Sequence, residues 1–208
     1  MKPVICFIDD AEFEHDLVRN EIAPLIPDMT FIQTYTFDAA RRTLGMTGPA
    51  LFLLDLWGQD ADVSEPYLTP RHELEKMIAD FPSLDDVYAG LEHFKGDLNN
   101  EYLKRFFSIV NCWRTLFEKI CSRIGQNGKY GLSNLAQARL HYPDIPAVFY
   151  TRKSLVNDAV AMFRAEADGL LIKPTGTSND ETRHLTREFA PRLANELKHI
   201  IASKDGRK

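Results

Sequence analysis

The amino-acid sequence predicts an α/β protein: a doubly wound parallel sheet of five strands, with an α-helical subdomain inserted in its middle. Five short apolar runs, each about the length of a strand, are each followed by a segment with helical periodicity. This alternation favours an open parallel sheet with helices on both faces. After the third run the alternation stops for about 70 residues, which is too long for a bare loop in a compact domain. Helical patterns fill that stretch, so we expect an inserted helical segment.

The first two strand–helix units have clear boundaries. Residues 4–8 are continuously apolar, as in a strand buried on both faces. Residues 12–22 place apolar side chains near a period of 3.6, and prolines just beyond them stop the expected helix. The β-branched and aromatic run 30–35 predicts the second strand. Asp38 is expected to cap a short helix that ends at Leu44.

The third strand and the insertion come next. Residues 50–54 are the most apolar run in the chain. A threonine followed by a first-turn proline predicts a helix over 69–81. The tetrapeptide Ser-Leu-Asp-Asp resembles a capping box and opens a second helix over 83–94. An asparagine at 99 or 100 opens a third helix, which runs to about residue 124 before two glycines end it.

The alternation then resumes. We expect a helix over 132–140, a strand over 147–150 that reaches Thr151, a helix over 155–166 and a short strand over 169–172. Ser178 or Asp180 is expected to cap a terminal helix that continues toward residue 203. The predicted domains are therefore 1–58 together with 130–208, interrupted by a helical insertion over 59–129.

Composition narrows the class of function. A net charge of −5 argues against a surface built to neutralise nucleic-acid phosphates. The longest apolar run is far below the roughly 20 residues that a membrane-spanning helix needs. Cys6, Cys112 and Cys121 have no CxxC spacing, which is typical of reduced thiols in the cytoplasm.

Five polar residues stand at the ends of the predicted strands: Asp9, Asp10, Asp55, Thr151 and Lys173. Ligands of doubly wound sheets bind at the carboxyl ends of the strands, so these residues are the candidate site. Three crowded carboxylates suit a hard cation such as Mg²⁺. A hydroxyl and an ammonium beside them can hold the oxygens of a phosphoryl group carried by a carboxylate.

The strand-end motifs resemble those of two-component response-regulator receiver domains, which are CheY-like and flavodoxin-like. The motifs are Phe7-Ile-Asp-Asp10, Leu54-Asp-Leu56, Phe149-Tyr-Thr151 and Leu171-Ile-Lys-Pro174, and they come in the family's order. The resemblance covers about residues 3–58 and 130–203. It implies the strand order 2-1-3-4-5.

The resemblance also implies a metal centre and a phosphoacceptor. Asp55 would accept the phosphoryl group. Asp10 and Asp55 would bind Mg²⁺ together with the backbone oxygen of Trp57, and Asp9 would assist through a water molecule. The chain would then be a phosphoacceptor module and no enzyme acting on other molecules.

Three further expectations follow from the same resemblance. Lys173 would contact the phosphoryl oxygens, and the hydroxyl of Thr151 would act as a switch that turns toward the phosphoryl group. Pro174 would follow a cis peptide bond. The partners would be a sensor histidine kinase or phosphotransfer protein in a phosphorelay and an unknown downstream protein, with no direct DNA binding, because no basic segment or helix-turn-helix follows the fifth strand unit.

The sequence departs from the family pattern in three places. Arg152 and Lys153 follow Thr151 where the family has a small residue, so the two cations would strengthen phosphoryl binding, obstruct the donor, or point into water. Leu170 replaces the usual aromatic residue three positions before the lysine. Gly58-Gln59 stands where a proline usually follows the phosphoacceptor.

The third helix of the insertion carries a heptad seam of apolar residues. Its members are Leu103, Phe106, Val110, Trp113, Phe117, Ile120 and Ile124. The first expectation is that this seam packs against the insertion's own two shorter helices. The alternative is an interface, with a partner protein or within a homodimer, which the terminal helix could also form.

Two other functions compete with the receiver. A pseudo-receiver would keep the fold as an interaction scaffold, with Arg152 and the insertion closing the pocket. A phosphatase of the haloacid dehalogenase type also uses a strand-end aspartate, a threonine or serine, a lysine and Mg²⁺. Its first motif is Asp-x-Asp, whereas this chain has Asp9-Asp10-Ala11.

Overall fold

The structure is a computed structural model that describes residues 2–45, 47–59, 65–152 and 156–205. The chain separates into two compact units: the sheet unit, Met1–Asp60 with Gly128–Lys208, and the helical unit, Ala61–Asn127. Lys153 and Leu155, which the sequence placed after the switch threonine and at a helix start, lie outside the described residues. Among the helices in the described ranges, none is long and apolar enough to cross a membrane.

Five parallel strands form one sheet in the order β2-β1-β3-β6-β7. They are β1 (Val4–Ile8), β2 (Thr30–Thr34), β3 (Leu51–Leu54), β6 (Ala147–Thr151) and β7 (Gly169–Ile172). Counted within this sheet alone, the order is 2-1-3-4-5, which confirms the prediction and is the flavodoxin-like order of proteins such as CheY. The central strands are almost entirely buried, which is why their sequences are continuously apolar.

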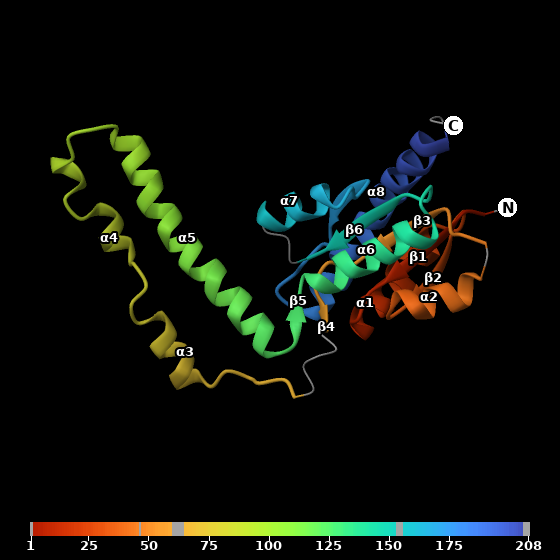
Figure 1. Ribbon diagram of the computed structural model, residues 1–208, viewed down its shortest axis with the longest axis horizontal. Helices are drawn as coiled ribbons and strands as arrows, with labels where there is room; N and C mark the ends of the chain where they lie inside the picture. Colours follow the sequence, from red (N-terminus) through yellow and green to blue (C-terminus); the bar gives the residue numbers. More distant parts are fainter. Residues whose placement is uncertain (1, 46, 60–64, 153–155, 206–208) are drawn as a thin grey trace. The chain divides into compact units, whose positions relative to one another are not determined.

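Helices cover both faces of the sheet (Figure 1). They are α1 (Glu12–Leu17), the π-helical turn η1 (Val18–Ile22), the 3₁₀ turn η2 (Ala23–Leu25), α2 (Phe37–Leu44), α6 (Lys129–His141), α7 (Val156–Arg164) and α8 (Asn179–Asp205). A short strand, β4 (Gly58–Gln59), follows β3. On one face η1 and α8 pack against each other over the main apolar core, which includes Phe7, Leu53 and Leu193. On the other face α2 and α6 lie over β1 and β3, and Phe37 contacts Phe52. Both faces are therefore covered, as a doubly wound sheet requires.

Helix boundaries in this unit differ from the sequence prediction in several places; α6, for example, begins at Lys129 and not at residue 132. The helix expected over 12–22 is α-helical only as far as Leu17; it continues as the π-helical turn η1 and then the 3₁₀ turn η2, which contains Pro24. The cap of α2 is Thr36 and not Asp38: the Thr36 hydroxyl accepts a hydrogen bond from the Ala39 amide at 3.2 Å. Phe37 is buried, so the helix begins there and the residue before it takes the cap position.

The helical unit contains α3 (Arg71–Ile78), α4 (Leu84–Tyr88), the 3₁₀ turn η3 (Leu91–His93), α5 (Leu98–Arg123) and the short strand β5 (Gln126–Asn127). The predicted capping box is present, since Ser83 and Asp86 bond each other's backbone amides. The second helix ends earlier than expected because Gly90 takes a left-handed conformation with φ 64°. Asp97, and neither predicted asparagine, caps α5 by accepting from the Asn100 amide at 3.0 Å.

The heptad seam of α5 is largely exposed. Its first five members have exposed fractions from 37% to 51%: Leu103, Phe106, Val110, Trp113 and Phe117. The buried residues of α5 are Leu116 and Cys121, and Arg105 bonds the α4 backbone at Val87 and Ala89. The expectation that the seam packs against the shorter helices is therefore wrong for Leu103, Phe106 and Val110, because those helices cover a neighbouring face of α5. Trp113, although half exposed, does meet Phe81 just after α3, edge to face with 5.4 Å between the ring centroids.

Candidate functional site

The strand register brings the predicted site residues to one edge of the sheet. Ile8 pairs with Leu54, and Leu54 pairs with Phe149, so the residues after β1 and β3 leave the sheet side by side. Thr151 pairs with Ile172, which places the end of β6 beside the residue that follows β7. This edge collects Asp9, Asp10, Asp55, Thr151 and Lys173 because parallel strands all end on the same side.

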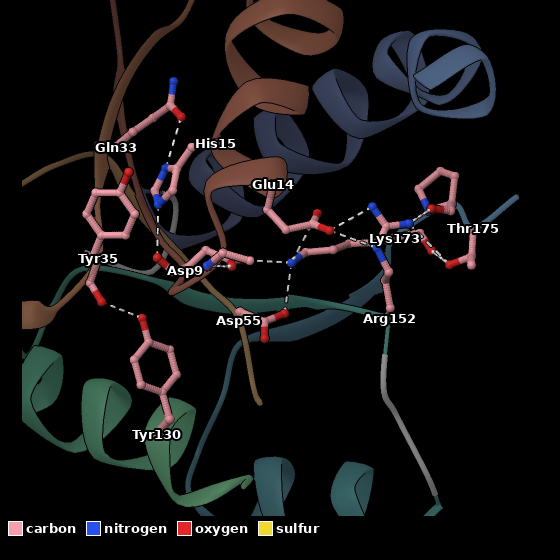
Figure 2. Close-up of polar contacts among 12 residues, drawn as sticks. Asp9, Glu14, His15, Gln33, Tyr35, Asp55, Tyr130, Arg152, Lys173 and Thr175 are labelled. Atoms are coloured by element: carbon pink, nitrogen blue, oxygen red, sulfur yellow. Dashed lines mark hydrogen bonds and ion pairs between the residues drawn. The ribbon is translucent and has the colours of Figure 1, made fainter. Parts of the chain in front are cut away.

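Lys173 lies at the centre of this edge and ties two of its acids together (Figure 2). Its Nζ lies 2.5 Å from Asp9 Oδ2 and 2.8 Å from Asp55 Oδ1. All three residues are buried, with exposed fractions of 4% for Lys173, 1% for Asp9 and 7% for Asp55. The ammonium also sits over the rings of Phe7 and Tyr150, at 5.7 Å and 5.6 Å from their centroids. A buried charge of this kind is tolerated only when it is paired and hydrogen-bonded.

The charges in this cluster shift one another's protonation. Burial raises the pKa of Asp9 to about 6, in spite of the opposing attraction of Lys173. Burial alone would favour the neutral form of Lys173. The carboxylates of Asp9, Asp55 and Glu14 outweigh that effect and hold the Lys173 pKa above its ordinary value. Lys173 is therefore a permanent cation in the site.

The acids at this edge can hold a metal ion. Asp9, Asp10 and Asp55 each offer a carboxylate oxygen, and these oxygens all lie within 4.8 Å of one another. Two backbone amides also hold the acids: Ala11 donates to Asp9 Oδ1 at 2.9 Å and Gln59 donates to Asp10 Oδ2 at 2.7 Å. Oxygen-only ligands of this type suit a hard divalent cation.

Thr151 has a buried hydroxyl that makes no hydrogen bond with the part of the chain described here. Its exposed fraction is 1%. A buried hydroxyl without a partner costs roughly 1–3 kcal/mol, so such groups usually serve a ligand or a water molecule. The lack of a partner fits a site that accepts an oxygen-rich group next to Thr151.

The sequence analysis did not include Glu14 in the site, and it left open where the Arg152 side chain points. Arg152 does not point into water, because its side chain is 19% exposed and bonds to Glu14, Pro174 and Thr175. Glu14, from α1, lies with one carboxylate oxygen 3.4 Å from Lys173 Nζ. Nothing in a helical pattern distinguishes Glu14 from a surface glutamate, so no sequence signal could have found it.

The backbone around Asp55 is held by close packing with α6. A methyl group added at Gly131 would lie 2.4 Å from the Asp55 carbonyl oxygen and 2.6 Å from Leu56 Cα. The Gly131 amide donates to the Leu56 carbonyl at 2.9 Å. A methyl group added at Gly58 would likewise meet the ring of Tyr130, so this position has no room for a side chain. It lies close to the position where the family that the sequence resembles usually has a proline.

One predicted backbone feature is wrong. The peptide bond before Pro174 is trans and not cis. The trans form is intrinsically preferred by about 0.5–1 kcal/mol even before proline. Here the Pro174 carbonyl accepts a hydrogen bond from Arg152, an interaction that the family resemblance did not include.

No protein-family model and no curated protein matches this chain. Among solved structures it is similar to a CheY-like response regulator receiver domain protein from Methanospirillum hungatei JF-1, with 11% identity over 98% of this chain and 99% of that one and a TM-score of 0.48. The signal receiver domain of a putative Luxo repressor protein from Vibrio parahaemolyticus has 13% identity over 99% and 94%, with a TM-score of 0.48. The receiver domain of NtrX from Brucella abortus has 15% identity over 90% and 98%, with a TM-score of 0.43.

The class that the fold defines is a doubly wound α/β protein of the receiver-like kind. This rests on the strand order β2-β1-β3-β6-β7 of the sheet unit itself. The resemblance inferred from the strand-end motifs is confirmed at the level of the fold.

Proposed function

We propose that this chain is a response-regulator receiver module of a two-component system that accepts a phosphoryl group on Asp55 in a Mg²⁺-dependent phosphorelay. The observation that carries the proposal is the buried Lys173, held between Asp9 and Asp55 at the carboxyl ends of the strands. A lysine in that place can contact the oxygens of a phosphoryl group on Asp55. The chain would be regulatory and would act in the cytoplasm, taking its phosphoryl group from a sensor histidine kinase, a phosphotransfer protein or a small acyl phosphate.

The chemistry is a transfer onto the chain's own side chain. A carboxylate oxygen of Asp55 forms the new bond to phosphorus, and the bond from phosphorus to the donor nitrogen or oxygen breaks, with its electron pair leaving on the donor. Lys173 already lies 2.8 Å from Asp55 Oδ1 and would stabilise the charge on the transferred oxygens. The Thr151 hydroxyl, which has no hydrogen-bond partner among the described residues, would donate to the same group and act as the switch.

The residues present fit a divalent cation. Asp10, Asp55 and the backbone oxygen of Trp57 would hold Mg²⁺ directly, and Asp9 would assist through water. Among the described residues, four carboxylates, counting Glu14, face two cations at this edge, Lys173 and Arg152, which leaves two negative charges to balance within that set. When bound, the metal would neutralise the repulsion between Asp55 and an incoming phosphoryl group.

The test is an intact-mass measurement after incubation with Mg²⁺ and a small acyl phosphate. We expect one labile phosphoryl adduct on the parent protein and none on Asp55→Asn. The matched control is Asp38→Asn, which changes an exposed aspartate in the first turn of α2 and should leave the adduct unchanged. An equal adduct on Asp55→Asn would refute Asp55 as the acceptor.

We further propose that the signal leaves through protein contacts of the helical unit and not through DNA. The five exposed seam residues of α5 support this, because a continuous apolar stripe on a helix is typical of a protein interface. Its occupant would be a downstream protein or a second copy of the chain. Hydrogen exchange of Ala61–Asn127 with and without a phosphoryl mimic tests the coupling, and identical exchange in both states would contradict it.

One observation favours a second function, the pseudo-receiver scaffold. Glu14 already occupies a position beside Lys173 that an incoming anion would approach, and Arg152 holds it there. In a scaffold of this kind the pocket would be permanently filled. A folded parent protein that binds Mg²⁺ and forms no adduct would support this function over phosphotransfer.

A further inference from the structure

Arg152, directly after the switch threonine, is held by three groups. Its Nε donates to Glu14 Oε1 at 2.8 Å, and its Nη2 lies 2.8 Å from the same oxygen. Its Nη1 donates to the Pro174 carbonyl and, at 3.3 Å, to the Thr175 hydroxyl. The guanidinium thus links α1 with the segment after β7, and it is a cation kept in place within the site.

Glu14 is shared between two cations, as Figure 2 shows. Its Oε1 faces Arg152, while its Oε2 lies 3.4 Å from Lys173 Nζ. The Glu14 side chain is 11% exposed, so water screens these contacts only weakly. Lys173 is the same lysine that contacts Asp55. Glu14 and Lys173 therefore form a chain of side-chain contacts from Arg152 to the phosphoacceptor.

A phosphoryl group on Asp55 would change the balance of charge around Glu14. The phosphoryl group carries about 1.5 to 2 negative charges and three strong acceptor oxygens. Lys173 would be required to pair with these oxygens. Glu14 would then lie as a like charge beside it, competing for the same cations. The planar fork of an arginine matches phosphoryl oxygens better than it matches a single carboxylate oxygen contacted from two nitrogens.

We propose that Arg152 pairs with Glu14 while Asp55 is unphosphorylated, and that after phosphorylation of Asp55 the Arg152 guanidinium leaves Glu14 and binds the phosphoryl oxygens. Arg152 is then a second phosphoryl-binding cation beside Lys173, and Glu14 is a positioning residue that competes for it. The inference rests on the proposed function and adds that Arg152 and Glu14 control the lifetime of the phosphorylated form. An Arg152 bound to the phosphoryl group shields it from water, and Glu14 limits that protection.

The test measures the decay of the adduct in the full chain. The protein is phosphorylated with Mg²⁺ and an acyl phosphate, the donor is removed, and the adduct is followed by intact mass. We expect Arg152→Met to shorten the lifetime about tenfold, the size of one lost charge-assisted hydrogen bond, and Arg152→Lys to recover part of it. We expect Glu14→Gln to lengthen the lifetime, and to do so only when Arg152 is present.

The matched control is Arg139→Met. Arg139 bonds Asp168 at 2.6 Å and the Ile145 carbonyl at 2.8 Å, so it is another partly buried arginine–carboxylate bridge of the sheet unit. It has no contact with the Lys173 cluster among the interactions of the described residues, and its loss should leave the decay unchanged. Circular dichroism melts of all variants establish that each is folded.

The outcomes are separable. If the parent forms an adduct and Arg152→Met decays at the parent rate, the inference is wrong while the proposed function stands. The same holds if Glu14→Gln changes the lifetime equally with and without Arg152, because its effect would then be one of local charge. If the folded parent forms no adduct at all, the proposed function fails and the inference fails with it.

Discussion

Replacing Gly131 with alanine tests how closely α6 controls the phosphoacceptor. The added methyl would lie 2.4 Å, 2.6 Å and 2.8 Å from the Asp55 carbonyl oxygen, Leu56 Cα and the Leu56 carbonyl oxygen. All three are backbone atoms, so no flexible side chain can move aside. Overpacking of this kind costs up to about 3 kcal/mol, and exchanging a helical glycine for alanine returns about 1 kcal/mol. The expected net loss is about 2 kcal/mol.

For a chain of this length that loss lowers the melting temperature by about 4–8 °C, which calorimetry can resolve. Movement of the Asp55 backbone should also weaken the Lys173 contact and slow adduct formation. Gly128→Ala is the control, because within the described ranges a methyl there would meet Leu56 side-chain atoms at the ordinary contact distances of 3.9 Å and 4.0 Å. An unchanged melting temperature and an unchanged phosphorylation rate in Gly131→Ala would refute the packing argument.

Three further predictions use groups in or near the same cluster. Burial raises the pKa of Asp9 in the folded protein to about 6, from an ordinary value of 3.8, so the folded state binds a proton that the unfolded state releases. Metal-free protein should therefore lose about 3 kcal/mol of stability as pH rises from 4 through 6, and urea unfolding of Asp9→Asn should not show that loss. Lys173→Met leaves buried carboxylates without their cation and should cost about 3–5 kcal/mol in urea unfolding; a cost below about 1 kcal/mol would contradict the pairing. Burial raises the pKa of Cys6 to about 12, so alkylation at pH 8 mapped by peptide mass should modify the partly exposed Cys112 well before Cys6.

The sheet and the location of the site follow from local sequence. Strands buried on both faces must be continuously apolar, and the residues that follow them must collect at one edge of a parallel sheet. Asp9, Asp55 and Lys173 therefore come together as their strand-end positions predict. The hydrophobicity of the strands and their order along the chain were enough to predict the sheet and the place of the site.

The contacts that the sequence did not reveal are those between distant segments. Glu14 and Arg152 are 138 positions apart, and their pairing depends on how α1 is rotated over the sheet. The close approach of Gly131 to Asp55 depends on the distance between α6 and β3 in the same way. A heptad pattern identifies an apolar face of α5 without identifying its partner, which is why the burial expected for that seam was wrong.

Chemical identification of the phosphorylated residue tests the central claim most directly. The protein would be phosphorylated with an acyl phosphate and Mg²⁺, then treated with borohydride, which reduces an aspartyl phosphate to homoserine, and mapped by peptide mass spectrometry. The proposed function predicts homoserine at position 55 and at no other aspartate. A phosphoryl group found on another residue, or no conversion at position 55 in a protein that carries the adduct, would contradict it.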